Sequence, residues 1–344
     1  MATKYYDGAK LLSLLDLEKK VPEIFFSATN RSAGKTTFFD KMILRRFMKH
    51  SLKFIILVRY NYECDGAIEN FLSASKTAGY YTSLQCHGEP RAKGKYYENF
   101  IGDKPCGYTI SLSDVDFIKK RSSLFSDGSC IVMDEVLPES KKYLPGEFDR
   151  FMSIHTSLSR GGGKQKKYLP VYMISNLISV INPYFQGWGI SDKIPQGCTF
   201  FRWYGAVFEF GYNESAADAQ KESGVMRAAR GINTYASYAQ EKGKFLADNY
   251  DMIEKMTGRS HYWCTLKDGN KKYGCKIFDS GYMYIDKKPD LSYNITVANK
   301  RSMDSDVYLS GYMSVIKNQL HAFYGRGAVR FKDLECKEAF LTFV

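Results

Sequence analysis

The chain lacks the cysteine and histidine patterns that mark zinc-binding and disulfide-stabilised proteins. Its 8 Cys are scattered without a Cys-x-x-Cys pair, and its 5 His form neither a His-x-x-His nor a His-Glu-x-x-His motif. These absences argue against a zinc site and a disulfide framework, and they favour a reducing compartment.

Long apolar runs are missing as well. No stretch of the sequence approaches the roughly 20 apolar residues that a membrane-spanning helix needs. The N-terminal segment shows no cleavage signal. We therefore expect a cytosolic protein that has no membrane partner.

Positive charge and aromatic residues are abundant instead. The 344 residues carry a formal net charge of +12, and they include 26 Tyr and 23 Phe. A chain of this length can form two domains with substantial cores. The charge favours a polyanionic partner, most often nucleic acid, although many basic proteins have no such partner.

The stretch from residue 23 to residue 50 has the layout of a phosphate-binding P-loop. A short apolar run, Ile24-Phe25-Phe26, predicts a buried strand; a loop of small residues follows, and Lys35 begins an amphipathic helix. Backbone N–H groups of such a loop bind phosphate; Lys35 would meet the β- and γ-phosphates, and Thr36 would be a ligand of Mg²⁺. The predicted contacts to ATP in this stretch are Thr29, Asn30, Arg31, Ser32, Ala33, Gly34, Lys35, Thr36 and Thr37.

One position departs from the full P-loop pattern, which has glycine where this chain has Thr29. A surface turn followed by a helix is therefore the alternative interpretation of this stretch. A second motif strengthens the first, because the apolar residues 130–133 predict a strand that ends in Asp134 and Glu135, as in a Walker B motif. Asp134 would hold Mg²⁺, and Glu135 would orient and polarise the attacking water. A surface strand ending in two acids is the alternative for this stretch alone, but the two motifs together predict ATP binding and hydrolysis.

Other segments follow an α/β pattern. The sequence predicts strands at 54–58 and 171–176 and helices at 10–20, 68–78, 113–121 and 148–160. Residues 85–99 predict a hairpin or loop whose basic residues adjoin tyrosines, a composition that suits contact with a phosphate backbone or a solvated loop equally well. The candidate DNA contacts are Arg91, Lys93, Lys95, Lys141 and Lys142.

Two further segments contain candidates for sensing or stabilising the γ-phosphate. Ser175 and Asn176 end the strand at 171–176, although a plain strand-to-turn transition is the alternative. Arg160 ends a predicted helix beside the glycine-rich loop 161–163, where an arginine finger could reach a neighbouring subunit's nucleotide. Capping its own helix is the simpler role for Arg160.

The motifs together resemble a known family. The segments SATNRSAGKTT, SCIVMDE, MISNLISVINPYF and GYMYID are similar to those of the DNA-packaging motor ATPase of small short-tailed phages with protein-primed genomes (Picovirinae type). The resemblance implies an additional-strand, conserved-glutamate (ASCE) P-loop fold. It also implies a homopentameric ring in the host cytoplasm that threads double-stranded DNA into a procapsid through a portal. Whether a packaging RNA takes part is left open.

The resemblance also implies roles for individual residues. Lys35 and Thr36 match the Walker A lysine and hydroxyl, and Asp134 and Glu135 match Walker B. The remaining matches are Ser175 and Asn176 with a coupling motif, Arg160 with a trans-acting arginine finger, Arg121 with a second trans-acting basic residue, and Arg31 with an arginine inside the Walker A loop.

The second half predicts a separate domain. The expected boundaries are an α/β ATPase domain with a mainly parallel sheet at 1–207, a helical linker at 208–255 and a ribonuclease H-like domain at 256–344. In the last domain we expect strands at 262–266, 273–278 and 281–285, a hairpin turn at 267–270 and a helix at 310–323. Asp279, Asp286 and Asp290 could belong to a two-metal nuclease or be ordinary turn residues, and the resemblance implies that the nuclease centre has been lost. The basic residues for contact with nucleic acid or portal are Lys271, Lys272, Lys276, Lys287 and Lys288.

These observations favour an ATP-driven translocase of double-stranded DNA. An ATPase that feeds an active metal-dependent terminase endonuclease is one alternative. A nucleic-acid-binding assembly switch controlled by ATP occupancy is another. A small-molecule kinase would leave the charge and the second domain unexplained.

Overall fold

The computed structural model describes residues 5–77, 79, 85–160, 165–191, 193–195, 197–221, 224, 251–299 and 310–344. The chain divides into two compact units, Met1–Trp188 with Ile194–Ala247 and Gly189–Lys193 with Asp248–Val344. Most of the predicted linker at 208–255 and the glycine-rich loop at 161–164 lie outside the described residues, so the predicted domain boundaries stay a prediction.

The first unit is built on a nine-stranded sheet with the strand order β3-β4-β5-β2-β6-β7-β1-β9-β8. The strands are β1 (Ile24–Thr29), β2 (Lys53–Val58), β3 (Cys86–Arg91), β4 (Tyr96–Ile101), β5 (Lys104–Ser111), β6 (Gly128–Met133), β7 (Val171–Asn176), β8 (Phe200–Trp203) and β9 (Ala206–Phe210). Neighbours from β5 through β9 pair in parallel, whereas β3, β4 and β8 are antiparallel to their partners. Strand β7 lies between the Walker A strand β1 and the Walker B strand β6, so the predicted ASCE class is confirmed.

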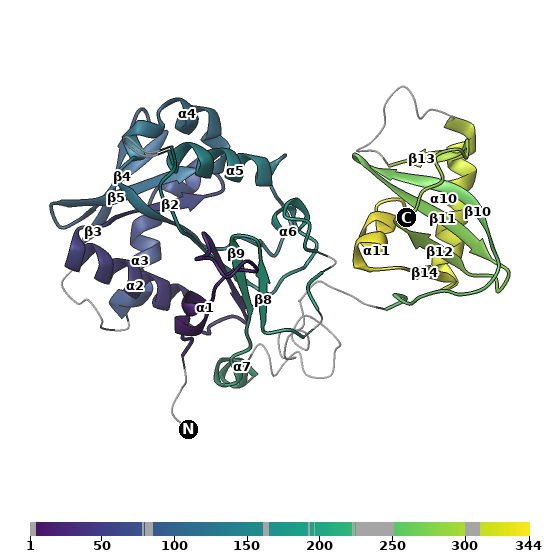
Figure 1. The fold of residues 1–344 in the computed structure, drawn as a ribbon, viewed down its shortest axis with the longest axis horizontal. Coiled ribbons are helices and arrows are strands. Elements are labelled where there is room, and N and C mark those ends of the chain that lie inside the picture. The colour runs from purple at the N-terminus through teal and green to yellow at the C-terminus, as the bar shows by residue number, and fades with distance from the viewer. Residues whose placement is uncertain are drawn as a thin grey trace. The chain divides into compact units, whose positions relative to one another are not determined.

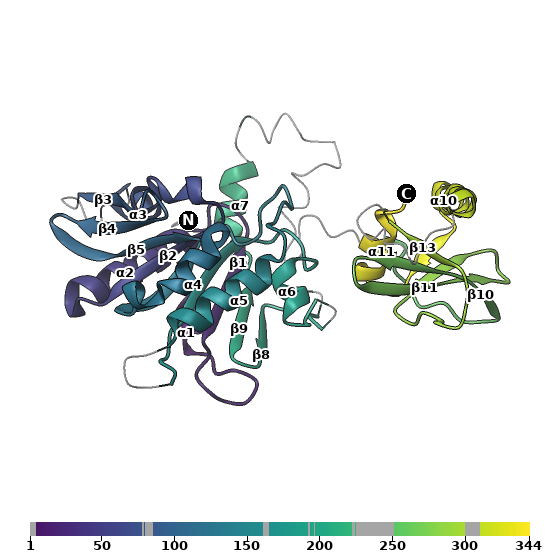
Figure 2. The ribbon, with the colours of Figure 1, turned by 90° about the horizontal axis from the view of Figure 1, so that it is seen from above.

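Helices cover both faces of this sheet (Figures 1 and 2). They are α1 (Ala9–Ser13), α2 (Lys35–His50) and α3 (Ala67–Thr77) on one face and α4 (Val115–Lys120), α5 (Glu147–Leu158) and α6 (Pro183–Gly187) on the other; α7 is Glu214–Lys221, and η1 (Asn61–Cys64), η2 (Leu112–Asp114) and η3 (Ser122–Phe125) are short 3-10 helices. The alternation of side chains along β1 shows why both faces are apolar. Phe25 packs against Tyr172 in the α2 layer, while Phe26 contacts Phe185 of α6 at 5.1 Å between ring centroids.

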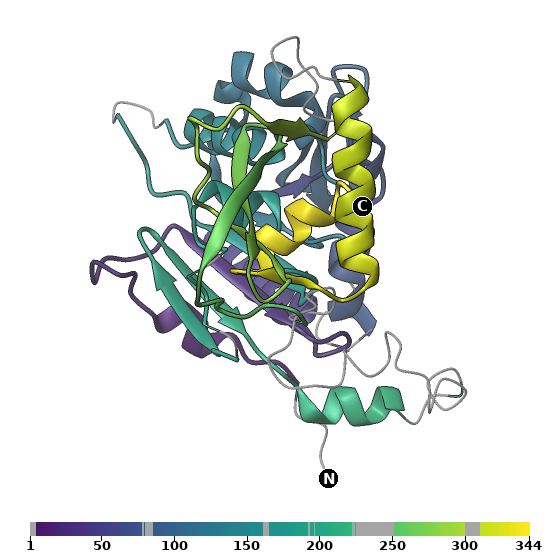
Figure 3. The same ribbon diagram turned by 90° about the vertical axis from the view of Figure 1, so that its right-hand side faces the viewer.

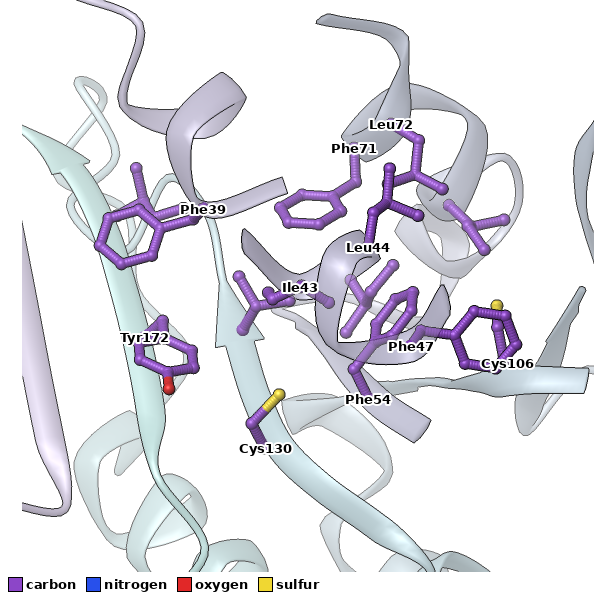
Figure 4. Packing of buried hydrophobic residues seen from close by; sticks show 14 of the residues in the cluster. Phe39, Ile43, Leu44, Phe47, Phe54, Phe71, Leu72, Cys106, Cys130 and Tyr172 are labelled. Carbon is purple, nitrogen blue, oxygen red and sulfur yellow. The ribbon is translucent and has the colours of Figure 1, made fainter. Parts of the chain in front are cut away.

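The core beneath α2 fixes the helix that begins at the predicted phosphate site. In Figure 4 side chains of α2 and α3 interdigitate with residues from β2, β5, β6 and β7. The labelled residues are Phe39, Ile43, Leu44, Phe47, Phe54, Phe71, Leu72, Cys106, Cys130 and Tyr172. Because α2 is anchored along its length, its N-terminus is held at the carboxyl ends of the parallel strands, where α/β sheets bind ligands.

The predicted leading helix at 10–20 was wrong in extent, because α1 ends at Ser13. Asp16 explains the loop that follows, since its carboxylate accepts N–H bonds from Glu18, Lys20 and Gly205 at 2.8–2.9 Å. Such local carboxylate bonds compete with helical ones. Strands β5, β8 and β9 were not anticipated, and β9 extends the parallel sheet beyond the predicted domain end at 207.

The second unit is also an α/β domain, as predicted. Its five-stranded sheet has the order β13-β10-β11-β12-β14. The elements are β10 (Ser260–Asp268), β11 (Lys271–Phe278), β12 (Met283–Asp286), β13 (Thr296–Ala298), β14 (Val329–Phe331), α10 (Ser310–Gly325) and α11 (Leu334–Leu341). The predicted hairpin turn joins β10 to β11, with Gly269 at φ 59°. In Figure 3 α10 runs along the strands, against which Ile316 and Leu320 pack. The ribonuclease H-like ancestry of this unit stays a prediction.

None of the described helices combines the length and the apolarity that crossing a bilayer requires.

Candidate nucleotide-binding site

The Walker A loop connects β1 to α2 and turns through two left-handed residues. Ser32 has φ 60°, and Gly34, which precedes the first helical residue, has φ 93°. Glycine tolerates the second conformation at little steric cost. Alternating backbone conformations of this kind turn successive N–H groups toward one concave surface, which suits an anion at a helix N-terminus.

Lys35 is buried at the start of α2, and its ammonium group rests on neutral oxygens. Its Nζ donates to Thr29 Oγ1 at 2.8 Å, to the Asn30 carbonyl at 3.1 Å and to Asn176 Oδ1 at 3.4 Å. Burial lowers the pKa of Lys35 to about 8, and the charges of Asp134 and Glu209 offset part of that effect. An incoming phosphate can replace these neutral acceptors and restore full stabilisation of the cation.

Thr36 and Asp134 bring two hard oxygen donors together. Thr36 Oγ1 donates to Asp134 Oδ2 at 2.9 Å, and the Glu135 N–H donates to Asp134 Oδ1 at 2.8 Å. Burial raises the pKa of Asp134, while these two hydrogen bonds oppose the rise. A hydroxyl beside a carboxylate fits Mg²⁺, which keeps several waters and takes its other ligands from phosphate. The described residues contain no group of three or more His, Cys, Asp or Glu side chains that could hold a metal without a nucleotide.

Glu135 follows β6 in a left-handed conformation, with φ 51°. That conformation costs a non-glycine residue about 1–2 kcal/mol, and non-glycine residues in it are concentrated at functional sites. The chain beyond Glu135 is fixed, because the Val136 N–H donates to the Ile174 carbonyl at 3.1 Å and the Leu137 N–H donates to Ser175 Oγ at 3.1 Å. The exposed carboxylate of Glu135 thus leaves a rigid backbone and faces the cavity.

Ser175 and Asn176 connect the two motifs from the end of β7. Ser175 accepts the Leu137 N–H of the Walker B segment, while Asn176 accepts from Lys35 of Walker A. The strand order explains the contact, since β7 lies between β6 and β1. The carboxyl end of β7 therefore links the Walker A and Walker B segments through hydrogen bonds.

These groups surround a cavity of about 960 Å³. Its walls come from residues 31–38, 134–135 and 175–176, with Lys41 and Thr77, and also from residues 5–7, which the sequence did not implicate. Tyr6 holds that N-terminal segment in place: its N–H donates to the Ala33 carbonyl at 2.8 Å, and its hydroxyl donates to Glu209 at 2.5 Å. Burial raises the pKa of both Tyr6 and Glu209.

Comparisons with known proteins identify the family of this chain. A family model described as Podovirus DNA encapsidation protein (Gp16) matches residues 2–343. The chain belongs to the Podovirus DNA encapsidation protein (Gp16) family. It is 23% identical to the DNA packaging protein of Bacillus phage PZA and 24% identical to that of Bacillus phage phi29, in each case over 269 residues that cover 76% of this chain and 74% of the relative.

Solved structures show the same fold. A chain of the bacteriophage Phi-29 viral genome packaging motor assembly aligns with a TM-score of 0.70 at 20% identity, covering 99% of this chain and 100% of that one. A chain of the Phi-28 gp11 DNA packaging motor aligns with a TM-score of 0.57 at 17% identity, covering 99% and 98%.

In this encapsidation-family chain, three predicted Walker A contacts have other partners. Thr29 and Asn30 are buried behind the cavity wall, where Thr29 accepts from Lys35 and the Asn30 side chain bonds to the main chain of Asn213. Neither residue lines the cavity, and their assignment as nucleotide contacts stays a prediction. Arg31 lines the cavity but forms an ion pair with Glu139, with Nε 2.8 Å from Oε1.

The predicted trans-acting arginines lie away from the site of their own chain. Arg121 ends α4 with its guanidinium 5.2 Å from the Phe117 ring centroid, and Arg160 follows α5; both are exposed. Lys167 places the end of α5 beside the start of β6, because its N–H donates to the Ser159 carbonyl and its Nζ donates to the Gly128 carbonyl. The start of β6 is the sheet edge opposite the nucleotide cavity.

The candidate DNA contacts of the first unit differ in their partners. Arg91 forms ion pairs with Glu89 and Glu98, and Lys95 forms one with Asp114 at 2.7 Å. Lys95 is nevertheless exposed, as are Lys93, Lys141 and Lys142, and Lys93 and Lys95 lie in the turn between β3 and β4.

Among the described residues, Asp279, Asp286 and Asp290 do not form a metal site. Asp286 is paired with Lys276 at 2.6 Å and accepts the Lys288 N–H, while Asp290 accepts from Ser292. Asp279 is exposed. No observation on the described residues favours a nuclease, and we do not propose one.

Proposed function

We propose that this chain is an ATP-hydrolysing ring motor that moves double-stranded DNA into a viral procapsid. The observation that supports this most is the convergence of Lys35, Thr36, Glu135 and Asn176 on one cavity in a chain of the encapsidation family. The relatives named above are DNA packaging proteins, and the aligned structures are packaging motors.

The chain's own residues have separable tasks in hydrolysis. Lys35 exchanges its bonds to Thr29 and Asn30 for phosphate oxygens, and Asn176 is positioned to follow that exchange because it also accepts from Lys35. Glu135 orients the attacking water and accepts its proton. Thr36 and Asp134 would hold Mg²⁺, which when bound neutralises charge that develops on the phosphates.

A ring explains why the site is open within one chain. Arg160 and Arg121 are exposed and do not line the cavity of their own chain, as expected for residues that act on a neighbouring subunit. An arginine supplied in trans would stabilise the transition state there. We adopt the pentamer and the portal and procapsid partners from the family resemblance, with a packaging RNA as an open addition, and place the assembly in the host cytoplasm.

Contacts to DNA should be made mainly to phosphate. The net charge of +12 supports a polyanionic substrate, and phosphate contacts carry no sequence information. Translocation is then sequence-independent and sensitive to salt. We assign hydrolysis to the domain at 1–207 and contact with nucleic acid or portal to the domain at 256–344, joined by the linker at 208–255.

The test compares the ATPase rate with and without linear double-stranded DNA for the native chain and for Glu135→Gln. We expect DNA to stimulate the native chain, and Glu135→Gln to retain nucleotide binding while losing about 10²–10⁴-fold in rate, the range of general-base contributions. A Glu135→Gln rate equal to that of the native chain would refute the assigned chemistry. Full packaging activity in that variant would instead support an occupancy switch.

A further inference from the structure

The buried Asn30 and the half-buried Asn213 join the Walker A loop to a helix far away in the sequence. Asn30 Nδ2 donates to the Asn213 carbonyl at 3.0 Å, and the Asn213 N–H donates to Asn30 Oδ1 at 2.8 Å. Both bonds use the side chain of Asn30 and the main chain of Asn213. Asn30 is only 7% exposed, so the pair is shielded from competing water.

The segment around Asn213 approaches the Walker A loop closely. The Gly211 N–H donates to the Ala28 carbonyl at 2.9 Å, and a Cβ added at Gly211 would lie 2.9 Å from Thr29 Cγ2. That separation is too short for a real Cβ. The close approach therefore requires glycine at 211 and places the two asparagines within hydrogen-bonding distance.

On one side the pair leads to the phosphate-binding lysine. The Asn30 carbonyl accepts from Lys35 Nζ at 3.1 Å and from Thr29 Oγ1 at 3.1 Å. When Lys35 turns to a phosphate, the Asn30 carbonyl loses a charged donor. Hydrogen bonds to charged groups are stronger than bonds between neutral groups, so this loss changes what holds the backbone at Asn30 in place.

On the other side the pair leads to α7. Asn213 Oδ1 accepts the Ala216 N–H at 2.9 Å and the Ser215 hydroxyl at 2.8 Å, so Asn213 caps the N-terminus of α7. The chain continues from α7 through residues 225–250, outside the described part, toward the second unit.

We propose that Asn30 is a positioning residue that transmits the nucleotide state of the Walker A loop to the cap of α7. The transmission runs from Lys35 through the Asn30 carbonyl and side chain to the main chain of Asn213. Phosphate binding thereby changes the stability of the first turn of α7, where the chain leaves the ATPase sheet. The inference rests on the proposed binding of ATP at this site.

The test is amide hydrogen exchange of peptides that cover 214–221 in the full-length protein, with and without a saturating non-hydrolysable ATP analogue and Mg²⁺. Opening of one capped turn governs this exchange, and we expect the analogue to change the rate at least about threefold, the effect of roughly 0.7 kcal/mol. Asn30→Ala should remove the nucleotide-dependent change. A fluorescent ATP analogue establishes saturation for each variant.

The matched control is Asn99→Ala. Asn99 is fully buried in the same unit and forms a comparable reciprocal pair with Thr109 at 3.0 and 3.1 Å. Asn99→Ala should lose similar stability but keep the nucleotide response of α7. A second pair of variants avoids the buried site: Asn213→Ala removes the cap and the response, whereas Asn213→Asp retains the cap and the response.

The outcomes separate this inference from the proposed function. Absence of nucleotide binding to the native chain would overturn both. Nucleotide binding without a change at α7, or an unchanged α7 response in Asn30→Ala, would overturn the coupling alone and leave the ATPase assignment intact.

Discussion

Two sets of buried or partly buried charges in this chain are stabilised in different ways. In the first unit, Lys35 is held by a hydroxyl, a carbonyl and a side-chain amide, and Asp134 by a hydroxyl and a backbone N–H. In the second unit, opposite charges pair directly: Lys276 lies 2.6 Å from Asp286, and Lys287 lies 2.8 Å from Glu335.

The difference separates a binding site from a structural network. A charge held by neutral dipoles keeps its net charge and can bind a charged ligand by exchanging hydrogen bonds. A charge paired with its opposite is already neutralised. Removing one residue of the ion pair leaves the other residue with an uncompensated charge that is partly removed from water. The same substitution should therefore have opposite consequences in the two units.

The largest expected effect compares Asp134→Asn with Asp286→Asn. Because burial raises the pKa of Asp134, the neutral amide relieves a desolvation cost, and we expect an unchanged or higher melting temperature. ATPase turnover should fall about 10³-fold with loss of a magnesium ligand. Asp286→Asn should destabilise the protein by about 1–2 kcal/mol, since it breaks a partly buried pair, and leave turnover per folded molecule unchanged.

Calorimetry measures the melting temperature of each variant, and a steady-state ATPase assay on the same samples measures its turnover. The comparison fails if Asp134→Asn and Asp286→Asn lower the melting temperature equally.

The next effect concerns the two lysines. Lys35→Ala removes charge-assisted bonds to phosphate that are worth about 1.5–3 kcal/mol each, so we expect about 100-fold weaker ATP binding. Lys276→Met, in the second unit, should not change ATP affinity, because Lys276 is committed to Asp286. Isothermal titration decides the matter, and equal losses in the two variants would contradict the assignment of the cavity.

Tyr5 tests the wall that the N-terminal segment adds to the cavity. Its side chain is 68% exposed and lies 3.5 Å from a Cβ placed on Gly34. Tyr5→Ala should raise the KM for ATP about fivefold through loss of roughly 1 kcal/mol of aromatic contact, whereas Tyr5→Phe should not. Tyr293→Ala in the second unit is the matched control, and KM values unaffected by any of the three would exclude a nucleotide contact for Tyr5.

The smallest expected effect concerns DNA binding by two basic surface residues, one paired with carboxylates and the other in an exposed turn. Arg91 is paired with Glu89 and Glu98, whereas Lys93 occupies an exposed turn, so Lys93 is the better candidate for a phosphate contact. Lys93→Ala should reduce the slope of log affinity against log salt by about 0.9, and Arg91→Ala should reduce it less. DNA-binding titrations at several salt concentrations measure this slope. The native chain and both variants would have the same slope if neither residue contacts DNA.

Local sequence patterns were enough to predict the parts of the site that are contiguous in the chain. The strand, loop and helix of Walker A, the acidic end of β6 and the polar end of β7 were all predicted from local patterns. These patterns are readable because apolar runs report buried strands and because parallel strands bring their carboxyl ends to one edge.

The hydrogen bonds that support the Walker A loop could be seen only in the folded chain. Thr29, which departs from the P-loop pattern, is an acceptor for Lys35; Asn30 bonds to Asn213; and Tyr6 bonds to Glu209. The last two pairs join residues 183 and 203 positions apart. Hydrogen bonds over such separations leave no periodic or compositional signal in the sequence. They form because β9 pairs with β1, which brings residues near 210 next to the N-terminal segment and the Walker A loop.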